Sequence, residues 1–350
     1  MVSRAVVVAA RVGPAALGYV HAASRRVEFG PMRLAFRILV VILVATAVFL
    51  VAGLIGTWAP DRPVERLAPR WASAPSQFLD VQGMKVHLRD EGPRDDPLPI
   101  VLLHGTSASL HTWEGWATAL RGQRRVIRFD LAGFGLTGPS PKNNYSIESY
   151  VAFVTAVLDR LGVQRFVLAG NSLGGQIALE TAYALPQRVD KLVLVDSAGY
   201  AFTPESIPMG FRIARVPGLR GLVELVLPRG VVQDSLRNVY GDPTKVSAEL
   251  VDRYYELTLR AGNRRALANR FQQMLTSDSA RIKALKQPTL ILWGGKDRLI
   301  PPENGREFAR DIAGSRLVVF DDLGHVPQEE DAERTVAEFR RFLGLSGPGT

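Results

Sequence analysis

The residues from 167 to 175, V-L-A-G-N-S-L-G-G, constrain this chain more than any other stretch. The apolar run 165–169 is typical of a buried strand, and the residues that follow the motif have helical spacing. Between them lies a G-x-S-x-G sequence centred on Ser172. A serine on such a sharp strand-to-helix turn is a nucleophile elbow, whose flanking glycines are needed because larger side chains would clash. We therefore predict that Ser172 is a nucleophile.

Strands and helices alternate around this motif. A predicted hairpin at 77–89 is followed by apolar runs that predict strands at 100–103, 125–129, 165–169, 191–195, 289–293 and 316–320. This rhythm predicts an α/β domain, with a mostly parallel eight-stranded sheet and helices on both faces. We assign the domain to 77–345. Residues 200–283 interrupt the rhythm with helical patterns, which predicts an inserted helical lid.

The N-terminal part has a different character. Residues 38–58 carry no charge and match the roughly 20 apolar residues that a spanning helix needs. A basic extension, 1–37, precedes them and holds six arginines and one glutamate. The positive-inside rule then places the N-terminus in the cytoplasm and the catalytic domain outside the cell membrane. A Pro-rich linker, 59–76, is expected to follow.

Two alternatives at this end stay open. A cleavable signal peptide has a shorter apolar region with a small-residue site just after it, whereas the nearest suitable site here, 72–74, lies well beyond the run. We therefore favour an uncleaved signal anchor. Translation that begins at Met32 is a second alternative, because that methionine directly precedes the basic flank.

Charge and composition exclude several other classes. The net charge of +9 is concentrated in 1–37 and 202–285, without a compact basic and aromatic stripe, so we expect no nucleic-acid partner. Two basic regions fit an anionic membrane surface better. The chain lacks cysteine, which excludes disulfides and thiolate metal sites. The Gly-rich runs match no nucleotide motif, so neither a metal nor a cofactor is expected. The sequence does not identify a protein partner.

A serine nucleophile needs a base, and the base needs a carboxylate to orient it. Among the five histidines, His325 follows the last predicted strand, where parallel strands build sites. Asp297 follows the preceding strand and is the predicted acid. Asp196, which follows the strand at 191–195, is the rival carboxylate.

The transition state also needs two N–H donors for its oxyanion. We expect one from the backbone of Leu173, at the start of the helix after the nucleophile, and the other from Thr106, in the loop after the strand at 100–103. His104 is predicted to position that loop, not to transfer protons.

Five motifs in this order resemble the α/β-hydrolase superfamily: H-G-T-S at 104–107, F-D-L-A-G-F-G at 129–135, G-N-S-L-G-G at 170–175, W-G-G-K-D at 293–297 and G-H-V-P-Q-E-E at 324–330. The resemblance implies a catalytic triad of Ser172, His325 and Asp297 under the lid. It also points to the branch of esterases, lipases and carbon–carbon hydrolases of ring-cleavage products. Epoxide hydrolases and haloalkane dehalogenases of that branch need an aspartate at the elbow, so Ser172 argues against both activities.

Three functions are open from the sequence. The first is a membrane-anchored serine hydrolase that cleaves small or lipid-like carboxylic esters. The lid stretch 211–227 mixes arginines with bulky aliphatic residues, so it either packs over the pocket as an ordinary lid or leans on the bilayer and admits acyl chains. The second is carbon–carbon bond hydrolysis of ring-cleavage products by the same triad. The third is a catalytically silent binding protein on this fold, since fold alone does not establish function.

Overall fold

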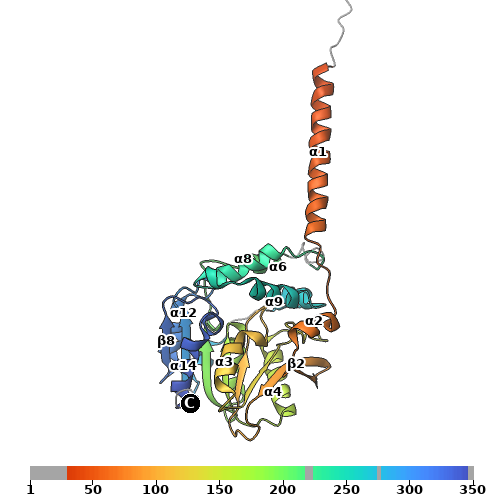
Figure 1. Ribbon diagram of the computed structural model, residues 1–350. Helices are drawn as coiled ribbons and strands as arrows, with labels where there is room; N and C mark the ends of the chain where they lie inside the picture. Colours follow the sequence, from red (N-terminus) through yellow and green to blue (C-terminus); the bar gives the residue numbers. More distant parts are fainter. Residues whose placement is uncertain (1–29, 217–223, 274–276, 346–350) are drawn as a thin grey trace, which may run out of the picture. The chain divides into compact units, whose positions relative to one another are not determined.

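The computed structural model describes residues 30–216, 224–273 and 277–345, and it separates into two compact units, Met1–Gly53 and Leu54–Thr350 (Figure 1). Most of the predicted extension 1–37 therefore lies outside the described residues. The same holds for residues 217–223 in the middle of the lid stretch.

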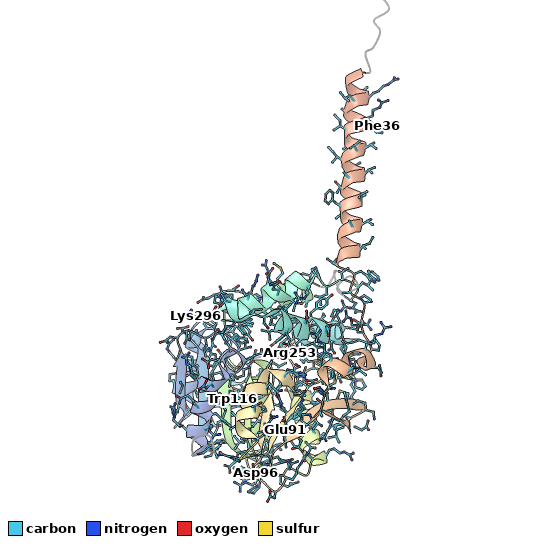
Figure 2. The ribbon with its side chains drawn as sticks, in the orientation of Figure 1. Phe36, Glu91, Asp96, Trp116, Arg253 and Lys296 are labelled. Carbon is cyan, nitrogen blue, oxygen red and sulfur yellow. The ribbon has the colours of Figure 1, made fainter. Side chains whose placement is uncertain are left out.

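Helix α1, Gly30–Gly56, contains all the described residues of the first unit. Its segment Met32–Gly53 has 22 residues and a mean hydropathy of 2.8, with none of its most apolar window buried. Large side chains such as Phe36 project from it into open space (Figure 2). The helix is therefore long and apolar enough to cross a membrane, a property that a signal sequence shares.

The second unit is built on an eight-stranded sheet in the order β1-β2-β4-β3-β5-β6-β7-β8. The antiparallel part pairs β1 with β2 and β2 with β4, and all other neighbours are parallel, as predicted. The strands are β1 Gln77–Val81, β2 Met84–Glu91, β3 Ile100–Leu103, β4 Val126–Phe129, β5 Phe166–Asn171, β6 Val189–Val195, β7 Thr289–Gly294 and β8 Arg316–Phe320.

Helices cover both faces of the sheet. One apolar core packs α4, Ile147–Arg160, α5, Leu173–Ala184, and α12, Pro302–Asp311, on one face. The other core packs α3, Glu114–Leu120, and α14, Ala332–Leu343, where the Trp116 ring stacks on Phe339 at 4.7 Å between centroids. Short turns at η1, Leu110–Trp113, and α13, Pro327–Glu330, complete these layers.

The lid, residues 200–283, is helical in its described parts, as predicted. The helices α8 and α9 lie with α6 across one end of the catalytic unit (Figure 1). Its elements are α6 Met209–Ala214, α8 Arg229–Val239, η3 Pro243–Lys245, α9 Ala248–Thr258, α10 Asn263–Gln272 and α11 Ser279–Lys283.

The segment 59–76 differs from the linker that its prolines suggested. It contains helix α2, Val64–Trp71, whose Leu67 and Trp71 are buried together with Leu136 and Leu257. Pro63 immediately precedes this helix, where a proline costs no helical hydrogen bond.

The expected end of the apolar span also differs. Trp58 belongs to the catalytic unit and forms a β-bridge with Val226 of the lid. Backbone pairing over a long sequence separation leaves no local trace in an uncharged run, so the sequence does not show that Trp58 pairs with the lid.

Candidate active site

The strand-to-helix turn at Ser172 has the backbone of a nucleophile elbow. Ser172 lies between β5 and α5 with φ 55° and ψ −116°, a conformation that costs energy for a residue with a side chain. A Cβ on Gly170 would come within 2.1 Å of the Gly174 carbonyl oxygen, and one on Gly174 within 2.3 Å of the Leu103 carbonyl oxygen. Both glycines are therefore required on steric grounds.

The predicted base and acid meet beside this turn. The Nδ1 atom of His325 lies 2.6 Å from Oδ2 of Asp297, and both side chains are buried. The other carboxylate oxygen of Asp297 accepts the backbone N–H groups of Leu299 at 2.8 Å and Ile300 at 3.0 Å. Three donors thus fix the carboxylate, which holds the proton on Nδ1 and leaves Nε2 of His325 free to accept one. His325 and Ser172 line the same pocket.

The rival carboxylate, Asp196, lies in the same cluster but has a different state. Ligand atoms of Asp196, Asp297 and His325 lie within 4.8 Å of one another. Burial, followed by the charge of Asp297, raises the pKa of Asp196 well above its ordinary value, which favours the neutral form of Asp196 over the charged form. Such a set of donors could hold a metal ion only if Nδ1 of His325 gave up its hydrogen bond to Oδ2 of Asp297, which spans 2.6 Å.

The loop that carries Thr106 packs against the elbow. A Cβ on Gly105 would lie 3.1 Å from the Cβ of Ser172, so the two backbones approach closely. His104 holds this loop: its Nε2 accepts the Leu131 N–H at 2.9 Å, and its Nδ1 donates to the Gly105 carbonyl at 2.8 Å. Burial lowers the pKa of His104, so it stays neutral. These contacts fit the predicted positioning role.

Two positioning residues were not predicted from the sequence. The side-chain amide of Asn171 donates to the backbone carbonyl oxygen of His325 at 3.0 Å. The residue next to the nucleophile therefore holds the loop that carries His325. Glu330 accepts N–H groups from Gly324 at 2.8 Å and Gly241 at 2.9 Å, which ties that loop to the lid. Both lie inside the quoted motifs, but the motifs do not reveal what their side chains contact.

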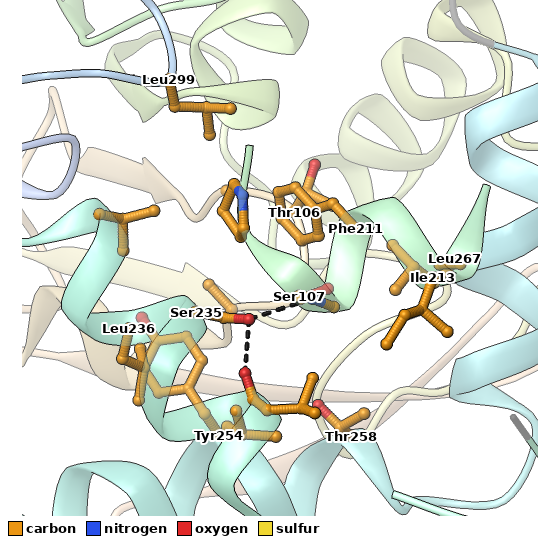
Figure 3. Close-up of a pocket in the computed structure, with 18 of the residues that line it drawn as sticks. Thr106, Ser107, Phe211, Ile213, Ser235, Leu236, Tyr254, Thr258, Leu267 and Leu299 are labelled. Carbon is orange, nitrogen blue, oxygen red and sulfur yellow. Dashed lines mark hydrogen bonds between the residues drawn. The ribbon is translucent and has the colours of Figure 1, made fainter. Parts of the chain in front are cut away.

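A pocket of ≈ 370 Å³ opens over Ser172 and His325, within the usual size range for small-molecule sites. Its walls include Thr106 and Ser107 from the loop, Leu299, and residues of the lid helices (Figure 3). The lid wall is tied together at Ser235, whose hydroxyl accepts the Gly210 N–H at 3.1 Å and donates to the Val231 carbonyl at 2.6 Å. Apolar lid residues dominate it: Pro208, Phe211, Ile213, Val226, Leu227, Val231, Val232, Leu236 and Leu267.

The described part of this wall has few charged groups. Arg264 and His325 are its basic side chains, and no acidic side chain lines it. Arg264 is compensated by Asp61, whose Oδ1 lies 2.6 Å from Nη2. Next to the wall residue Tyr254, the half-buried Arg253 forms an ion pair with Glu329, which also accepts the hydroxyl of Tyr254 at 2.8 Å. The pocket therefore presents an apolar surface with its nearby guanidinium charges neutralised.

The sequence profile of the alpha/beta hydrolase fold family matches residues 99–332. This match covers more than half of the chain and includes the elbow, Asp297 and His325, so the chain belongs to the α/β-hydrolase superfamily.

The similar proteins include enzymes with more than one activity. The chain is 33% identical over 274 residues to a 2-hydroxy-6-oxo-2,4-heptadienoate hydrolase of Pseudomonas putida, covering 75% of this chain and 93% of the relative. Among solved structures, a meta-cleavage product hydrolase from Pseudomonas fluorescens is 26% identical with a TM-score of 0.67, covering 77% of this chain and 97% of that one. A thermophilic esterase from Thermogutta terrifontis is also 26% identical, with a TM-score of 0.65 and coverage of 77% and 98%.

Proposed function

We propose that this protein is a serine hydrolase that cleaves carboxylic esters with uncharged, apolar acyl groups. The Ser172 hydroxyl attacks the ester carbonyl carbon while Nε2 of His325 takes its proton, and the oxyanion accepts hydrogen bonds from the N–H groups of Thr106 and Leu173. The C–O bond then breaks, and His325 returns the proton to the leaving alcohol. Water attacks the acyl-enzyme in the same way and releases the carboxylic acid.

The observation that carries this choice is the charge of the pocket. An apolar acyl chain is stabilised by an apolar wall in proportion to the area it buries. A dienoate substrate carries a carboxylate, whose burial is costly without a free cation. The guanidinium group on the described wall, that of Arg264, is already paired with Asp61, and the neighbouring Arg253 is paired with Glu329.

Hydrolysis of a carbon–carbon bond is the second candidate, and the names of the relatives favour it. Two proteins at 33% and 30% identity are a heptadienoate hydrolase and a hydroxymuconate semialdehyde hydrolase. Such a reaction would use the same Ser172, His325 and Asp297. It would also require Arg264 to exchange Asp61 for the substrate carboxylate.

We further propose that residues 38–58 include an uncleaved membrane anchor, with the N-terminus in the cytoplasm and the catalytic unit on the outer side of the cell membrane. The apolar character of Met32–Gly53 and the arginines Arg33 and Arg37 at its start support this arrangement. Reporter fusions at both ends of the chain test this arrangement. If a reporter that functions only in the cytoplasm were active when fused to the C-terminus, the proposed orientation would be wrong.

The two chemical candidates are separated by one comparison. The kcat/KM of the purified full-length protein is measured with p-nitrophenyl esters of saturated fatty acids and, separately, with 2-hydroxy-6-oxo-2,4-heptadienoate. We expect turnover of the esters, abolished by Ser172→Ala, and a much lower kcat/KM for the dienoate. A higher kcat/KM for the dienoate would establish the second candidate, and no turnover of either would favour a silent binding protein.

A further inference from the structure

The residues that directly follow α1 are bonded to the lid. The Leu227 N–H donates to the Thr57 carbonyl at 3.0 Å, and the Ala59 N–H donates to the Leu225 carbonyl at 2.8 Å. Leu227 lines the pocket, and Leu225 lies two residues before it in the chain. One wall of the pocket is therefore held by the segment 57–59, which starts where α1 ends.

The length of the chain limits how far this wall can lie from the apolar segment. Met32–Gly53 is long and apolar enough to span a membrane, and Thr57 follows Gly53 by four residues. Four residues reach at most about 14 Å, even when they are fully extended. The headgroup layer on each side of a bilayer is about 5–8 Å thick. With the apolar segment in a membrane, the lid backbone at 225–227 must therefore lie in or close to the headgroup layer, whatever the orientation of the catalytic unit.

Exposed hydrophobic side chains gather on the same part of the lid. Beyond α1, six large hydrophobic side chains are strongly exposed among the described residues, and two of them, Phe78 and Tyr183, lie on β1 and α5. The other four lie on or beside the lid: Trp58, Met209, Val216 and Leu225. Trp58 also forms a β-bridge with the pocket residue Val226. A cluster of exposed hydrophobic groups marks a contact surface, and tryptophan is favoured where that contact is a membrane interface.

Helix α6 has a pocket side and an outer side. Phe211 and Ile213 line the pocket. With about 3.6 residues per turn, Met209, Arg212 and Arg215 project from the opposite side, where all three are exposed. No acidic side chain among the described residues forms an ion pair with either arginine. The outer side thus combines a hydrophobic group with two uncompensated cations, which is the composition of a helix that lies on an anionic lipid surface.

We propose that this outer surface of the lid rests on the bilayer that holds the chain's own apolar segment, and that the pocket takes acyl esters dissolved in that bilayer. The inference rests on the proposed function and the proposed anchor, because it names where the ester substrate comes from. We call the surface the membrane face and define it by six residues: Trp58, Met209, Arg212, Arg215, Val216 and Leu225.

The position of the pocket wall gives the membrane face a role in substrate binding. Val226 and Leu227 line the pocket and also belong to the segment that pairs with residues 57–59. An acyl chain that passes from the bilayer into the pocket along this wall stays in contact with hydrophobic surface. It therefore avoids the free-energy cost of exposing its apolar area to water.

The absence of cysteine allows the membrane face to be located without any turnover. Full-length chain is reconstituted in vesicles of phosphatidylcholine and phosphatidylglycerol, with one fluorophore attached through Leu225→Cys. Quenching by a phosphatidylcholine that carries a spin label on its headgroup reports how close the fluorophore lies to the lipid. Tyr183→Cys is the matched control, because Tyr183 is 43% exposed against 42% for Leu225 but lies near the end of α5 that is remote from Ser172.

Activity is measured in the same vesicles with two esters. 4-Methylumbelliferyl palmitate dissolves in the bilayer, whereas p-nitrophenyl acetate stays in water. Arg212→Glu reverses a charge on the membrane face. Its matched control is Arg160→Glu, which reverses an exposed charge at the end of α4.

We expect the label attached through Leu225→Cys to be strongly quenched and the label attached through Tyr183→Cys to be nearly unquenched. Arg212→Glu should lower kcat/KM for the palmitate by about fivefold or more, since one basic residue near an anionic surface contributes about that factor. The same variant should leave kcat/KM for the acetate unchanged, because Arg212 does not line the pocket. Arg160→Glu should change neither value.

Several results would overturn the proposal. They are equal quenching of the two labels, equal effects of Arg212→Glu and Arg160→Glu on the palmitate, or an equal loss for both esters in Arg212→Glu. A label attached through Leu225→Cys that is shielded from iodide in water but is not quenched by the lipid would assign the surface to a second copy of the chain instead. Met209→Cys replaces Leu225→Cys if that variant does not fold. Failure of the proposed function is seen separately, as no turnover of the acetate by the unsubstituted chain, and it leaves the quenching comparison intact.

Discussion

The replacement Asp297→Asn tests the geometry of the site most sharply. Oδ1 of Asp297 accepts two backbone N–H groups, so the oxygen of an asparagine would keep that position. Its NH₂ group would then face Nδ1 of His325, where Oδ2 now lies at 2.6 Å. Nδ1 would have to accept a hydrogen bond, which moves the imidazole proton to Nε2 and removes the base. Loss of the correct tautomer costs about 10⁴-fold in kcat, or about 5 kcal/mol of transition-state stabilisation.

The assay is steady-state hydrolysis of a p-nitrophenyl ester, with stability checked by thermal unfolding. Asp196→Asn is the matched control. The pKa of Asp196 is raised by burial, which favours its neutral form, and its Oδ1 accepts the Gly294 N–H at 2.9 Å, as an amide oxygen also can. We expect the control to lose less than about tenfold in kcat. If Asp297→Asn kept nearly full activity, or if Asp196→Asn were the more damaging change, the assignment of the acid would be wrong.

Further predictions concern the elbow, the pH dependence of stability and the loop of the base. Gly170→Ala should prevent folding or cost several kcal/mol, at roughly the level of other severe core clashes, because its Cβ would lie 2.1 Å from a backbone oxygen; urea unfolding checks this. Burial lowers the pKa of His111 to about 3, below the ordinary value near 6.5, so the unfolded state takes up a proton first as the pH falls. The contribution of His111 is thus complete above about pH 6.5 and is lost by about 1.4 kcal/mol per pH unit down to about pH 3, and His111→Gln should flatten the unfolding free energy over that window. The carboxylate of Glu330 accepts N–H groups from Gly324 and from the lid, and Glu330→Gln leaves only one oxygen to accept them. We expect kcat to fall by about tenfold or more without a matching rise in KM. An unchanged kcat would show that Glu330 does not position the loop that carries His325.

The parts of the fold that could be predicted are those with local signals. Buried strands are short apolar runs, and the elbow carries its glycines at fixed positions around Ser172. The mostly parallel eight-stranded sheet and the pairing of His325 with Asp297 could therefore be predicted from the sequence. The family resemblance of the same motifs is confirmed by the profile match.

The contacts that could not be predicted join residues far apart in the chain. Nothing near Trp58 indicates that it pairs with Val226, and nothing near Asp61 indicates its bond to Arg264. The apolar run before Trp58 is uniformly uncharged, so its sequence does not mark where the helix ends. The raised pKa of Asp196 likewise depends on burial beside Asp297, which only the assembled sheet edge provides.

Reaction with an alkyl fluorophosphonate, followed by peptide mass spectrometry, tests the central claim that Ser172 is an activated nucleophile in an apolar pocket. We predict one adduct per chain, located on Ser172, and no adduct in Ser172→Ala. A folded chain that stays unlabelled, or that carries the adduct on another residue, would contradict the account.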